Sequence, residues 1–223
     1  MNVLPKSYLK FGGWTLLIGG TMGILGQLLH IGDTPASLED IPGFLQKAVN
    51  THVLLAWASI LILMGMPAIY LRMAERLSAW GWIGFPLLFA GMLLEIFHGP
   101  VQILAYPIIY DHVKDAATLQ TVNDQVNNLM VDRYPLSLAV LIPLVPAILL
   151  GLLLLGIATI RAKVYPRWLG VLAVVVLAVM IAGIMVQTIN VFPAVHLLFA
   201  LFGAMLAFGK NGAAEREQVT AAA

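Results

Sequence analysis

Glu95, His98 and Gln102 stand together in the stretch EIFHGPVQ, inside an otherwise apolar run that begins at Trp80. Glu95 and His98 form a Glu-x-x-His pair, the spacing at which helical bundles present a carboxylate and an imidazole to a di-iron site. A glutamate can also act as a general base toward a metal-bound water, whose pKa the metal lowers to about 7. These residue types in an apolar run predict a metal-ligand set or an acid–base centre.

Three further histidines, His30, His52 and His196, also fall in apolar stretches. The helical rise of about 1.5 Å per residue places them and His98 roughly 21 to 30 Å from the basic end of their own spans. The four therefore share one slab beneath the outer surface, whereas His112 falls in a loop. Imidazole nitrogen binds Fe, Cu, Zn and Ni, and it also serves as an axial ligand to haem.

Helical spacing places each of these histidines on a face of small residues. The aligned sets are Gly19, Gly23, Gly26 and His30; His52, Ala56 and Ser59; Gly84, Gly91, Glu95, His98 and Gln102; Gly183, Gln187 and Asn190; and His196, Ala200, Gly203 and Ala207. Small residues mark the faces where membrane helices approach closely, and ionisable groups in lipid nearly always face the bundle interior and pair.

This alignment predicts that the four histidines and Glu95 converge in one cluster. Its predicted metal or cofactor ligands are His30, His52, His98 and His196. Its predicted catalytic residue is Glu95, as ligand or base. The polar residues expected around it are Gln27, Gln102, Gln187 and Asn190, which can also act as interhelical hydrogen-bond groups.

The elements that position these residues are membrane helices. Of 223 residues, 61% are hydrophobic and only 10% are charged, whereas soluble domains are about a quarter charged. Because a spanning helix needs roughly 20 mostly apolar residues, the sequence predicts an all-α, polytopic membrane helix bundle. The six expected spans lie near 11–31, 51–71, 80–105, 134–160, 168–190 and 193–209. They form one transmembrane domain over 1–210, followed by a flexible cytoplasmic tail over 211–223.

Charge predicts the orientation of the spans. Basic residues lie before the first span, between the second and third, between the fourth and fifth, and after the sixth. Acidic residues dominate the loops 32–50 and 106–133. The positive-inside rule then predicts a multi-pass protein of the cell membrane, with both termini cytoplasmic and these two loops outside. The net charge of +1 argues against nucleic acid as a partner. The absence of cysteine excludes disulfides, iron–sulfur clusters and thiolate zinc sites.

Short amphipathic helices are expected in both outer loops. In 115–133, apolar residues recur every three or four positions among Asp, Asn and Gln, which predicts a helix lying on the surface. Ser37 and Asp40 have the spacing of a capping box, which predicts a shorter helix before Gln46. Two such helices flanking a polar pocket would act as a lid.

Two resemblances add to this interpretation. The stretches GMPAIYLRMAERLSAWGWIGFPLLFAGMLLEIFHG and GIATIRAKVYPRWLGVLAVV resemble those of a broad group of bacterial six-helix membrane proteins with a domain of unknown function. The stretch THVLLAW is similar to the His-x-x-Leu-Leu-x-Trp opening of the second helix in small proteins related to the catalytic subunit of haem–copper oxidases. That resemblance implies His52 as a haem ligand, although the second nearby histidine of the pattern is missing.

Three classes of function remain open from the sequence. The cluster binds haem b or a transition-metal ion (Fe, Cu or Zn) and takes part in redox chemistry or electron transfer. Alternatively, the protein is a metal-dependent membrane hydrolase or lipid-modifying enzyme with Glu95 as base, or a non-enzymatic transporter or accessory subunit. The expected partners are membrane lipids, a small apolar substrate entering from the outer leaflet, and a second copy of the chain or a respiratory partner.

Overall fold

The computed structural model describes residues 5–128, 138–186 and 190–209, without the side chains of His98 and Leu141. These residues are helical, joined by turns and short extended segments, and contain no strand. The elements are α1 (Lys6–Leu29), α2 (Ile41–Met73), the 3₁₀ turn η1 (Ala74–Arg76), α3 (Ala79–Pro100), the π-helical turn η2 (Val101–Ala105), α4 (Tyr106–Asp111), α5 (Ala116–Asn128), α6 (Leu138–Ala162), α7 (Arg167–Val186) and α8 (Phe192–Phe208).

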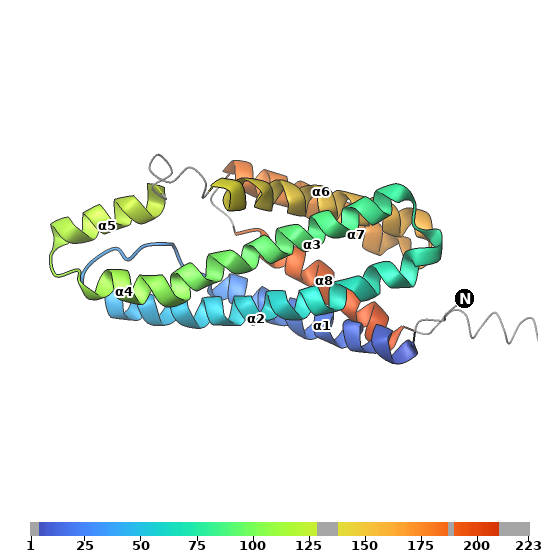
Figure 1. Ribbon diagram of the computed structural model, residues 1–223, viewed down its shortest axis with the longest axis horizontal. Coiled ribbons are helices and arrows are strands. Elements are labelled where there is room, and N and C mark those ends of the chain that lie inside the picture. Colours follow the sequence, from blue (N-terminus) through green and yellow to red (C-terminus); the bar gives the residue numbers. More distant parts are fainter. Residues whose placement is uncertain (1–4, 129–137, 187–189, 210–223) are drawn as a thin grey trace, which may run out of the picture.

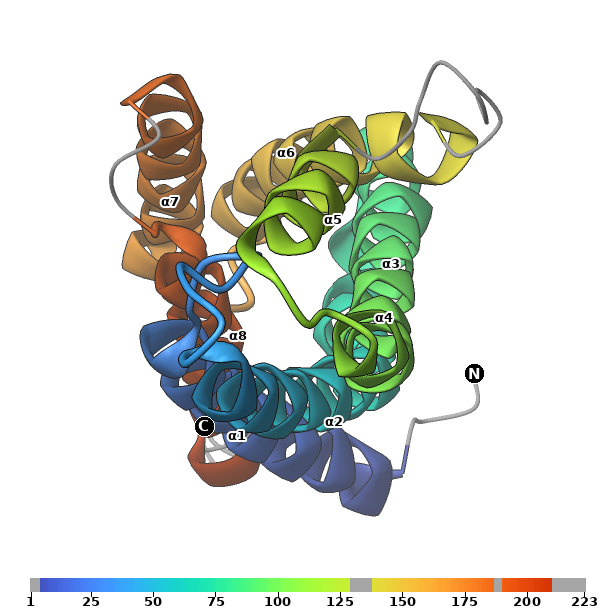
Figure 2. The same ribbon diagram turned by 90° about the vertical axis from the view of Figure 1, so that its left-hand side faces the viewer.

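The six longest helices of the bundle close into a ring. Helix α1 packs between α2 and α8, α3 packs between α2 and α6, and α7 packs between α6 and α8, as Figure 2 shows along the bundle. Within the described residues, five runs of helix are long and apolar enough to cross a membrane: Lys6–Leu29, Ile41–Arg76, Ala79–Asp111, Leu138–Ala162 and Arg167–Val186. The sixth, α8, is apolar but has 17 residues. The all-helical architecture with several long apolar helices is thus confirmed, whereas membrane insertion and the count of six spans stay predictions.

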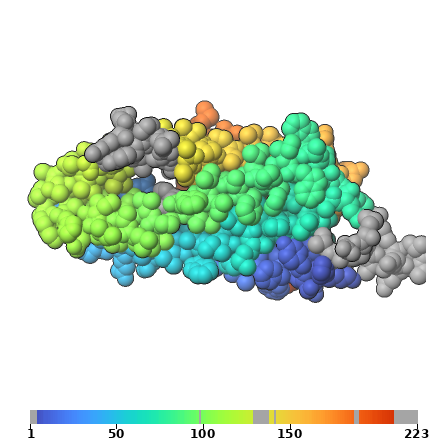
Figure 3. Space-filling model, in the orientation of Figure 1, coloured from blue at the N-terminus to red at the C-terminus, as the bar shows by residue number. Residues whose placement is uncertain are grey.

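Many large apolar side chains on the outside of the bundle are exposed. Leu28, Ile142 and Met185 are 68%, 63% and 80% exposed, and they belong to three different helices. Side chains such as Thr15, Ser59 and Thr159 are buried instead. Exposed apolar surface of this extent is typical of contact with another protein or with a membrane, and the exposed large apolar side chains belong to all six long helices. Figure 3 shows the elongated surface that the bundle and the cap form together.

Small residues bring α1 and α8 into close contact, as the sequence predicts for that face of α8. A Cβ atom on Gly20 would lie 2.6 Å from the backbone nitrogen of Ala200 and from the carbonyl oxygen of His196. Another Cβ, on Gly203, would lie 2.7 Å from the carbonyl oxygen of Gly13. The two backbones therefore approach too closely for larger residues at these positions.

Two helices are much longer than a membrane crossing requires. Helix α2 has 33 residues, and α3, η2 and α4 form a second run of 33 residues. At about 1.5 Å per residue each run measures roughly 50 Å, against a hydrocarbon thickness of about 30 Å. Figure 1 shows both runs extending to one end of the molecule, where α5 lies.

The projecting helix ends form a small second core. The Phe44 ring of α2 lies 6.0 Å from the Tyr106 ring and 5.7 Å from the Tyr110 ring of α4. Leu119 of α5 is buried in the same cluster. We call residues 31–40 and 106–128, which include α4 and α5, the cap, and this end of the bundle the capped end. The opposite end, where Lys6, Arg72, Arg76, Arg161 and Arg167 lie at helix ends or in the adjoining turn, is the basic end.

One of the two predicted loop helices is present, and the prediction of the other is wrong. Helix α5 covers Ala116–Asn128 of the predicted 115–133, and residues 129–133 lie outside the described part. The separate helix before Gln46 does not exist, because α2 begins at Ile41 and continues unbroken. Beyond Gly43 no helix-breaking residue interrupts the chain before the apolar span, so the helix propagates into it.

Ser37 and Asp40 do not form the predicted capping box. The Ser37 hydroxyl donates to the Asp40 carboxylate at 2.7 Å, so the two side chains bond to each other. Asp40 makes no side-chain hydrogen bond to the α2 backbone. A capping box instead needs each side chain to bond to the backbone N–H of the other residue.

The π-helical turn η2 lies between two prolines, Pro100 and Pro107. The backbone N–H of Tyr106 donates to the carbonyl of Val101, five residues back. Pro107 has no N–H to donate, so the α-helical hydrogen bond to residue 103 cannot form. Turns of this kind are rare and occur mostly within α-helices, frequently at functional sites.

Candidate functional site

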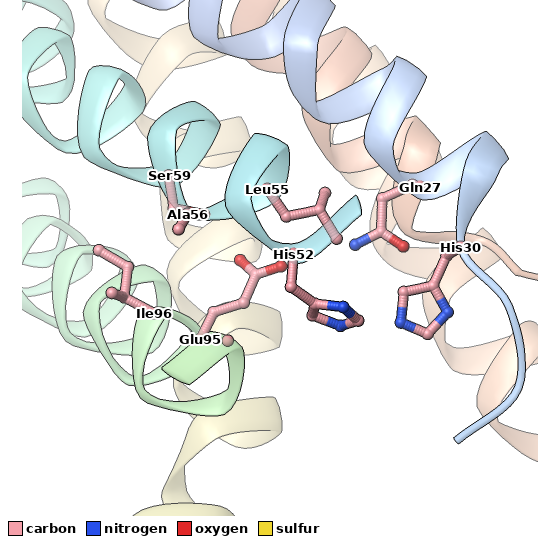
Figure 4. Close-up of a pocket in the computed structure, with 9 residues that line it drawn as sticks. Gln27, His30, His52, Leu55, Ala56, Ser59, Glu95 and Ile96 are labelled. Atoms are coloured by element: carbon pink, nitrogen blue, oxygen red, sulfur yellow. The ribbon is translucent and has the colours of Figure 1, made fainter. Parts of the chain in front are cut away.

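A cavity of about 60 Å³ lies between α1, α2 and α3 near the capped end (Figure 4). Its lining residues are Gln27, His30, His52, Leu55, Ala56, Ser59, Glu95, Ile96 and Gly99. Because one water needs roughly 10–15 Å³ by this kind of measure, the cavity holds about four waters, or one ion with part of its hydration shell. Its polar groups come from the three helices and from His30, directly after α1.

The position of His52 fixes which of its nitrogens carries the proton. Its Nδ1 lies 2.8 Å from the carbonyl oxygen of Ala48, one turn earlier in α2. A carbonyl oxygen can only accept, so Nδ1 donates and the neutral ring keeps its lone pair on Nε2. The side chain is buried. His52 is therefore held as a base or metal ligand that acts through Nε2.

His30 faces His52 across the cavity. The two imidazole centroids are 5.0 Å apart, with the rings inclined at 69°, and Figure 4 shows each ring pointing toward the other. His30 is the first residue after α1 and has an extended backbone, with φ −63° and ψ 132°. The end of the helix thus determines its position, and its side chain is half-buried.

Glu95 enters the cavity from α3. Figure 4 shows its carboxylate directed across to α2, on the side of His52. Ser59, two turns after His52 on α2, adds a buried hydroxyl to the same lining. The cavity thus combines one carboxylate, two imidazoles and a hydroxyl in an otherwise apolar bundle, where such groups are expensive and usually functional.

Gln27 and Asn190 connect the cavity to the start of α8. The amide nitrogen of Asn190 donates to the Gln27 carbonyl at 2.9 Å and to the Gln27 side-chain oxygen at 3.0 Å. The side-chain oxygen of Asn190 accepts from the backbone N–H of Phe192 at 3.1 Å. Gln27 lines the cavity, so these predicted neighbours of the site are linked to each other at its edge.

Polar contacts that sequence reasoning missed hold the cap together and fasten it to the bundle. Gln102, which is buried, donates to the Asp33 carboxylate at 3.1 Å. Asn123 of α5 donates to the carbonyl of Pro35 at 2.9 Å and accepts from the Tyr110 hydroxyl at 2.9 Å. The one sequence signal for this contact is the four-residue spacing of Tyr106 and Tyr110, which places both rings on one helical face. Gln102 therefore belongs to the cap contact and does not line the cavity.

His196 is buried in a different place. It packs against Gly23 at the contact of α8 with α1, where any Cβ on Gly23 would collide with the imidazole. Its Nδ1 lies 3.1 Å from the carbonyl oxygen of Phe192. Among the described residues its Nε2 has no hydrogen-bond partner, and His196 does not line the cavity. The structure thus brings His30, His52 and Glu95 together and leaves His196 between two helices.

Two predicted site residues lie outside this description. The backbone of His98 belongs to α3, one turn after Glu95, but its side chain is not among those described. Gln187 falls outside the described residues altogether. Their predicted roles as ligand and supporting group stay predictions.

The fit of a cofactor follows from the size and donors of the cavity. Within the described part of the chain, no three His, Asp or Glu side chains are close enough to form a complete metal site. Drug-sized ligands occupy pockets of about 300–1,000 Å³, so a cavity of about 60 Å³ gives no support to haem b, which stays a prediction. The volume leaves room for a single ion with a few waters.

Comparisons with known proteins add no relationship. The resemblances to bacterial six-helix membrane proteins and to oxidase-related proteins remain predictions from the quoted stretches. No protein-family model, curated protein or solved structure matches this chain.

Proposed function

We propose that the chain is a multi-pass protein of the cell membrane that binds a transition-metal ion in the cavity between α1, α2 and α3. His52 and His30 are the imidazole ligands, and Glu95 binds directly or through a water. One observation carries the proposal: the carbonyl of Ala48 fixes the His52 tautomer so that Nε2 keeps its lone pair, in a cavity shared with His30 and Glu95.

The chemistry of the donors supports an ion of the Fe, Cu or Zn class. Metal-binding histidines almost always donate their other ring N–H to a carboxylate, carbonyl or water, which is what His52 does toward Ala48. Two imidazoles with one carboxylate are the ligand set of non-haem iron oxygenases and of several zinc hydrolases. Both keep open positions for water, and this cavity has volume for a few.

Drawing three ligands onto one ion requires a small movement, because the described side chains do not converge fully. His30 is the ligand best able to supply it. It lies after the last residue of α1, in extended backbone, and is half-buried. His52, by contrast, is buried within a helix. We therefore assign His52 as the fixed ligand and His30 as the ligand that closes on the ion.

The reaction class depends on which ion is bound. With zinc, a bound water of lowered pKa would act as a nucleophile, and Glu95 would accept its proton. With iron or copper, the same ligands would support redox chemistry. In both cases the reaction lies near the capped end, and the protein is an enzyme of the membrane interface rather than a transporter with a midplane site.

Metal analysis of the detergent-purified protein tests this proposal. We expect about one Fe, Cu or Zn per chain, or uptake of one Co²⁺ with a visible d–d spectrum. His52→Ala and Glu95→Ala should weaken binding by about 100-fold, at the upper end of losses seen even for supporting groups. Ala56→Phe keeps every ligand but fills the cavity, and it should also prevent binding.

The matched control is His112→Ala, because the His112 side chain is 84% exposed in the cap. Its metal content should equal that of the unmodified protein. A preparation that contains no metal and takes up no Co²⁺ would overturn the proposal. Equal binding in the His52→Ala, Ala56→Phe and His112→Ala proteins would overturn it as well, since the metal would then lie elsewhere.

A further inference from the structure

We infer that Gln27 is a hydrogen-bond donor to an anionic oxygen or nitrogen of the ligand taken up in the cavity, and that Asn190 is the residue that positions it. The inference rests on the proposed metal site and names the class of its exogenous ligand. That ligand is a small anion, or the terminal anionic group of a larger substrate, and it binds beside the ion with one atom accepting from Gln27.

The orientation of both amides follows from two backbone groups. The N–H of Phe192 can only donate, so the Asn190 atom 3.1 Å from it is the oxygen Oδ1. The carbonyl of Gln27 can only accept, so the Asn190 atom 2.9 Å from it is the nitrogen Nδ2. Neither amide plane can be turned over without placing two donors or two acceptors against each other.

The same nitrogen determines how the side chain of Gln27 is turned. Asn190 Nδ2 also lies 3.0 Å from the Gln27 side chain, so the atom it meets must be the acceptor Oε1. The amide group –NH₂ of Gln27 therefore points the other way. Figure 4 shows this nitrogen on the side of Leu55 and His52, within the lining of the cavity.

Burial gives this donor its importance. Gln27 is only 9% exposed, and a buried amide N–H₂ is costly unless it donates a hydrogen bond. The oxygen of this amide accepts a hydrogen bond from Asn190. Gln27 therefore presents only its –NH₂ donor to the cavity. A donor beside a metal ion stabilises negative charge on the atom bound there, as the donors of an oxyanion hole do.

The volume of the cavity limits the size of the anion. About 60 Å³ accommodates a hydroxide, an azide or a formate together with the ion, or one terminal group of a longer molecule. A larger substrate would have to leave its remaining atoms outside, toward His30 and the cap. The ligand class is therefore a small anion or a terminal carboxylate or phosphoryl group.

Azide titration of the Co²⁺-loaded protein, followed by its d–d spectrum, tests the inference. Gln27→Leu removes the donor, and the azide Kd should rise about 10- to 100-fold, as expected for a lost hydrogen bond to a charged group. Asn190→Asp should do the same through Gln27. An aspartate can only accept, so it would take the –NH₂ group of Gln27 and turn Oε1 toward the cavity. Co²⁺ binding is titrated first in each variant, so that each azide Kd is measured on fully Co²⁺-loaded protein.

A matched variant separates the effect of the turned Gln27 amide from the effect of an added negative charge. Asn128→Asp makes the same chemical change at an exposed position of α5 and should leave the azide Kd unchanged. The loss in Asn190→Asp should also persist at about 0.5 M salt, because screening weakens distant charges but not a reversed hydrogen bond.

The outcomes are distinct from those of the metal proposal. If Co²⁺ binds normally and both variants keep the azide Kd of the unmodified protein, the role of Gln27 is overturned while the metal site stands. If Gln27→Leu loses affinity and Asn190→Asp does not, the positioning role of Asn190 is overturned. If no variant, including the unmodified chain, binds Co²⁺, both proposals are overturned.

Discussion

The same two helices, α1 and α2, meet in opposite ways at the two ends of the bundle. At the basic end Gly12 and Gly65 lie backbone against backbone, and a Cβ on Gly65 would lie 2.5 Å from the Gly12 carbonyl oxygen. At the capped end the two helices carry Gln27 and His52, and a cavity separates their side chains. Where two helices touch through glycine, no room is left for a polar group that could bind a ligand.

Side-chain contacts between neighbouring helices reinforce the contrast. At the basic end the Arg72 guanidinium lies 5.3 Å from the centre of the Tyr165 ring, and Arg76 donates to the carbonyl of Ala162 at 3.4 Å. These cations are held by an aromatic face and by a helix C-terminus, both of which favour positive charge. At the capped end the charged and polar groups line a cavity or fasten the cap. The difference teaches that α1 and α2 pack directly against each other at the basic end, whereas polar groups line a cavity between them at the capped end.

The largest expected effect concerns which side of the membrane each end faces. The chain has no cysteine, so in each single-cysteine variant a maleimide can label only the introduced residue. Lys114→Cys in the cap and Glu75→Cys at the basic end are both exposed positions. By the positive-inside rule, a membrane-impermeant maleimide should label Lys114→Cys in intact cells and Glu75→Cys only after the cells are opened.

Labelling of both variants after lysis is the control for accessibility. The reverse pattern in intact cells would place the basic end outside and contradict the proposed orientation. Equal labelling of both variants in intact cells would contradict the proposal that the bundle spans the membrane between them.

The next effect tests whether the close helix contact carries stability. Gly20→Val should destabilise the bundle by about 1–3 kcal/mol or more, because the new Cβ meets backbone atoms of α8 that cannot rotate away. Unfolding in SDS, followed by loss of helicity or by proteolysis, measures this change. Gly32→Val is the matched control, since nothing lies within 4 Å of a Cβ at Gly32. Equal stability of the two variants would show that the α1–α8 contact is not the tight one described.

The smallest effect lies in the cap and depends on pH. The backbone N–H and the hydroxyl of Thr118 donate to Asp115, which holds the pKa of its carboxyl below 3.8, its ordinary value. Because this pKa is lowered by folding, the bond stabilises the start of α5 above the ordinary value and is lost as pH falls below it. Amide-exchange protection in α5, corrected for intrinsic rates, should therefore drop modestly between pH 5 and pH 3.

Asp115→Asn is the control for this titration. An asparagine at the N-cap still accepts a hydrogen bond but has no proton to gain. The change in protection between pH 5 and pH 3 should therefore disappear, while the core helices keep theirs in both proteins. A pH dependence that survived in Asp115→Asn would assign it to another carboxylate of the cap.

The sequence predicts the helices and their small-residue faces well, because both depend on local patterns. Hydropathy identifies the long apolar runs, and helical spacing places Ala200, Gly203 and His196 on the face of α8 that meets α1. Those properties need no knowledge of which helix lies beside which. They are therefore readable from a single chain.

The sequence does not predict which neighbouring helix packs against each of these faces, and His196 shows why. Helix α1 has two contact faces only one residue apart: Gly19 faces α2, whereas Gly20 faces α8. One residue corresponds to roughly 100° of rotation, so two histidines at equal depth can lie on opposite sides of one helix. His52 meets the cavity from α2, and His196 meets Gly23 from α8. Depth and polarity alone cannot separate these cases.

The cap was harder still to predict, because it depends on contacts between distant segments. The bonds from Gln102 to Asp33 and from Asn123 to Pro35 join residues far apart in the chain. The sequence does not predict the length of α2 for a local reason. Ser37 and Asp40 have the spacing of a capping box, but their side chains bond to each other, and one long helix begins at Ile41. A short polar motif can thus be satisfied in more than one way.

The π-helical turn at Val101–Ala105 acts as a one-residue insertion that keeps the cap and the bundle in register. If the same five residues were plain α-helix, everything beyond them would rotate by roughly 100° and rise about 1.5 Å more. Tyr106 and Tyr110 would then turn away from Phe44, and the second core would lose its facing rings. The half of this long helix that packs in the bundle and the half that projects into the cap are therefore two separate alignments on one chain, and a single extra residue reconciles them.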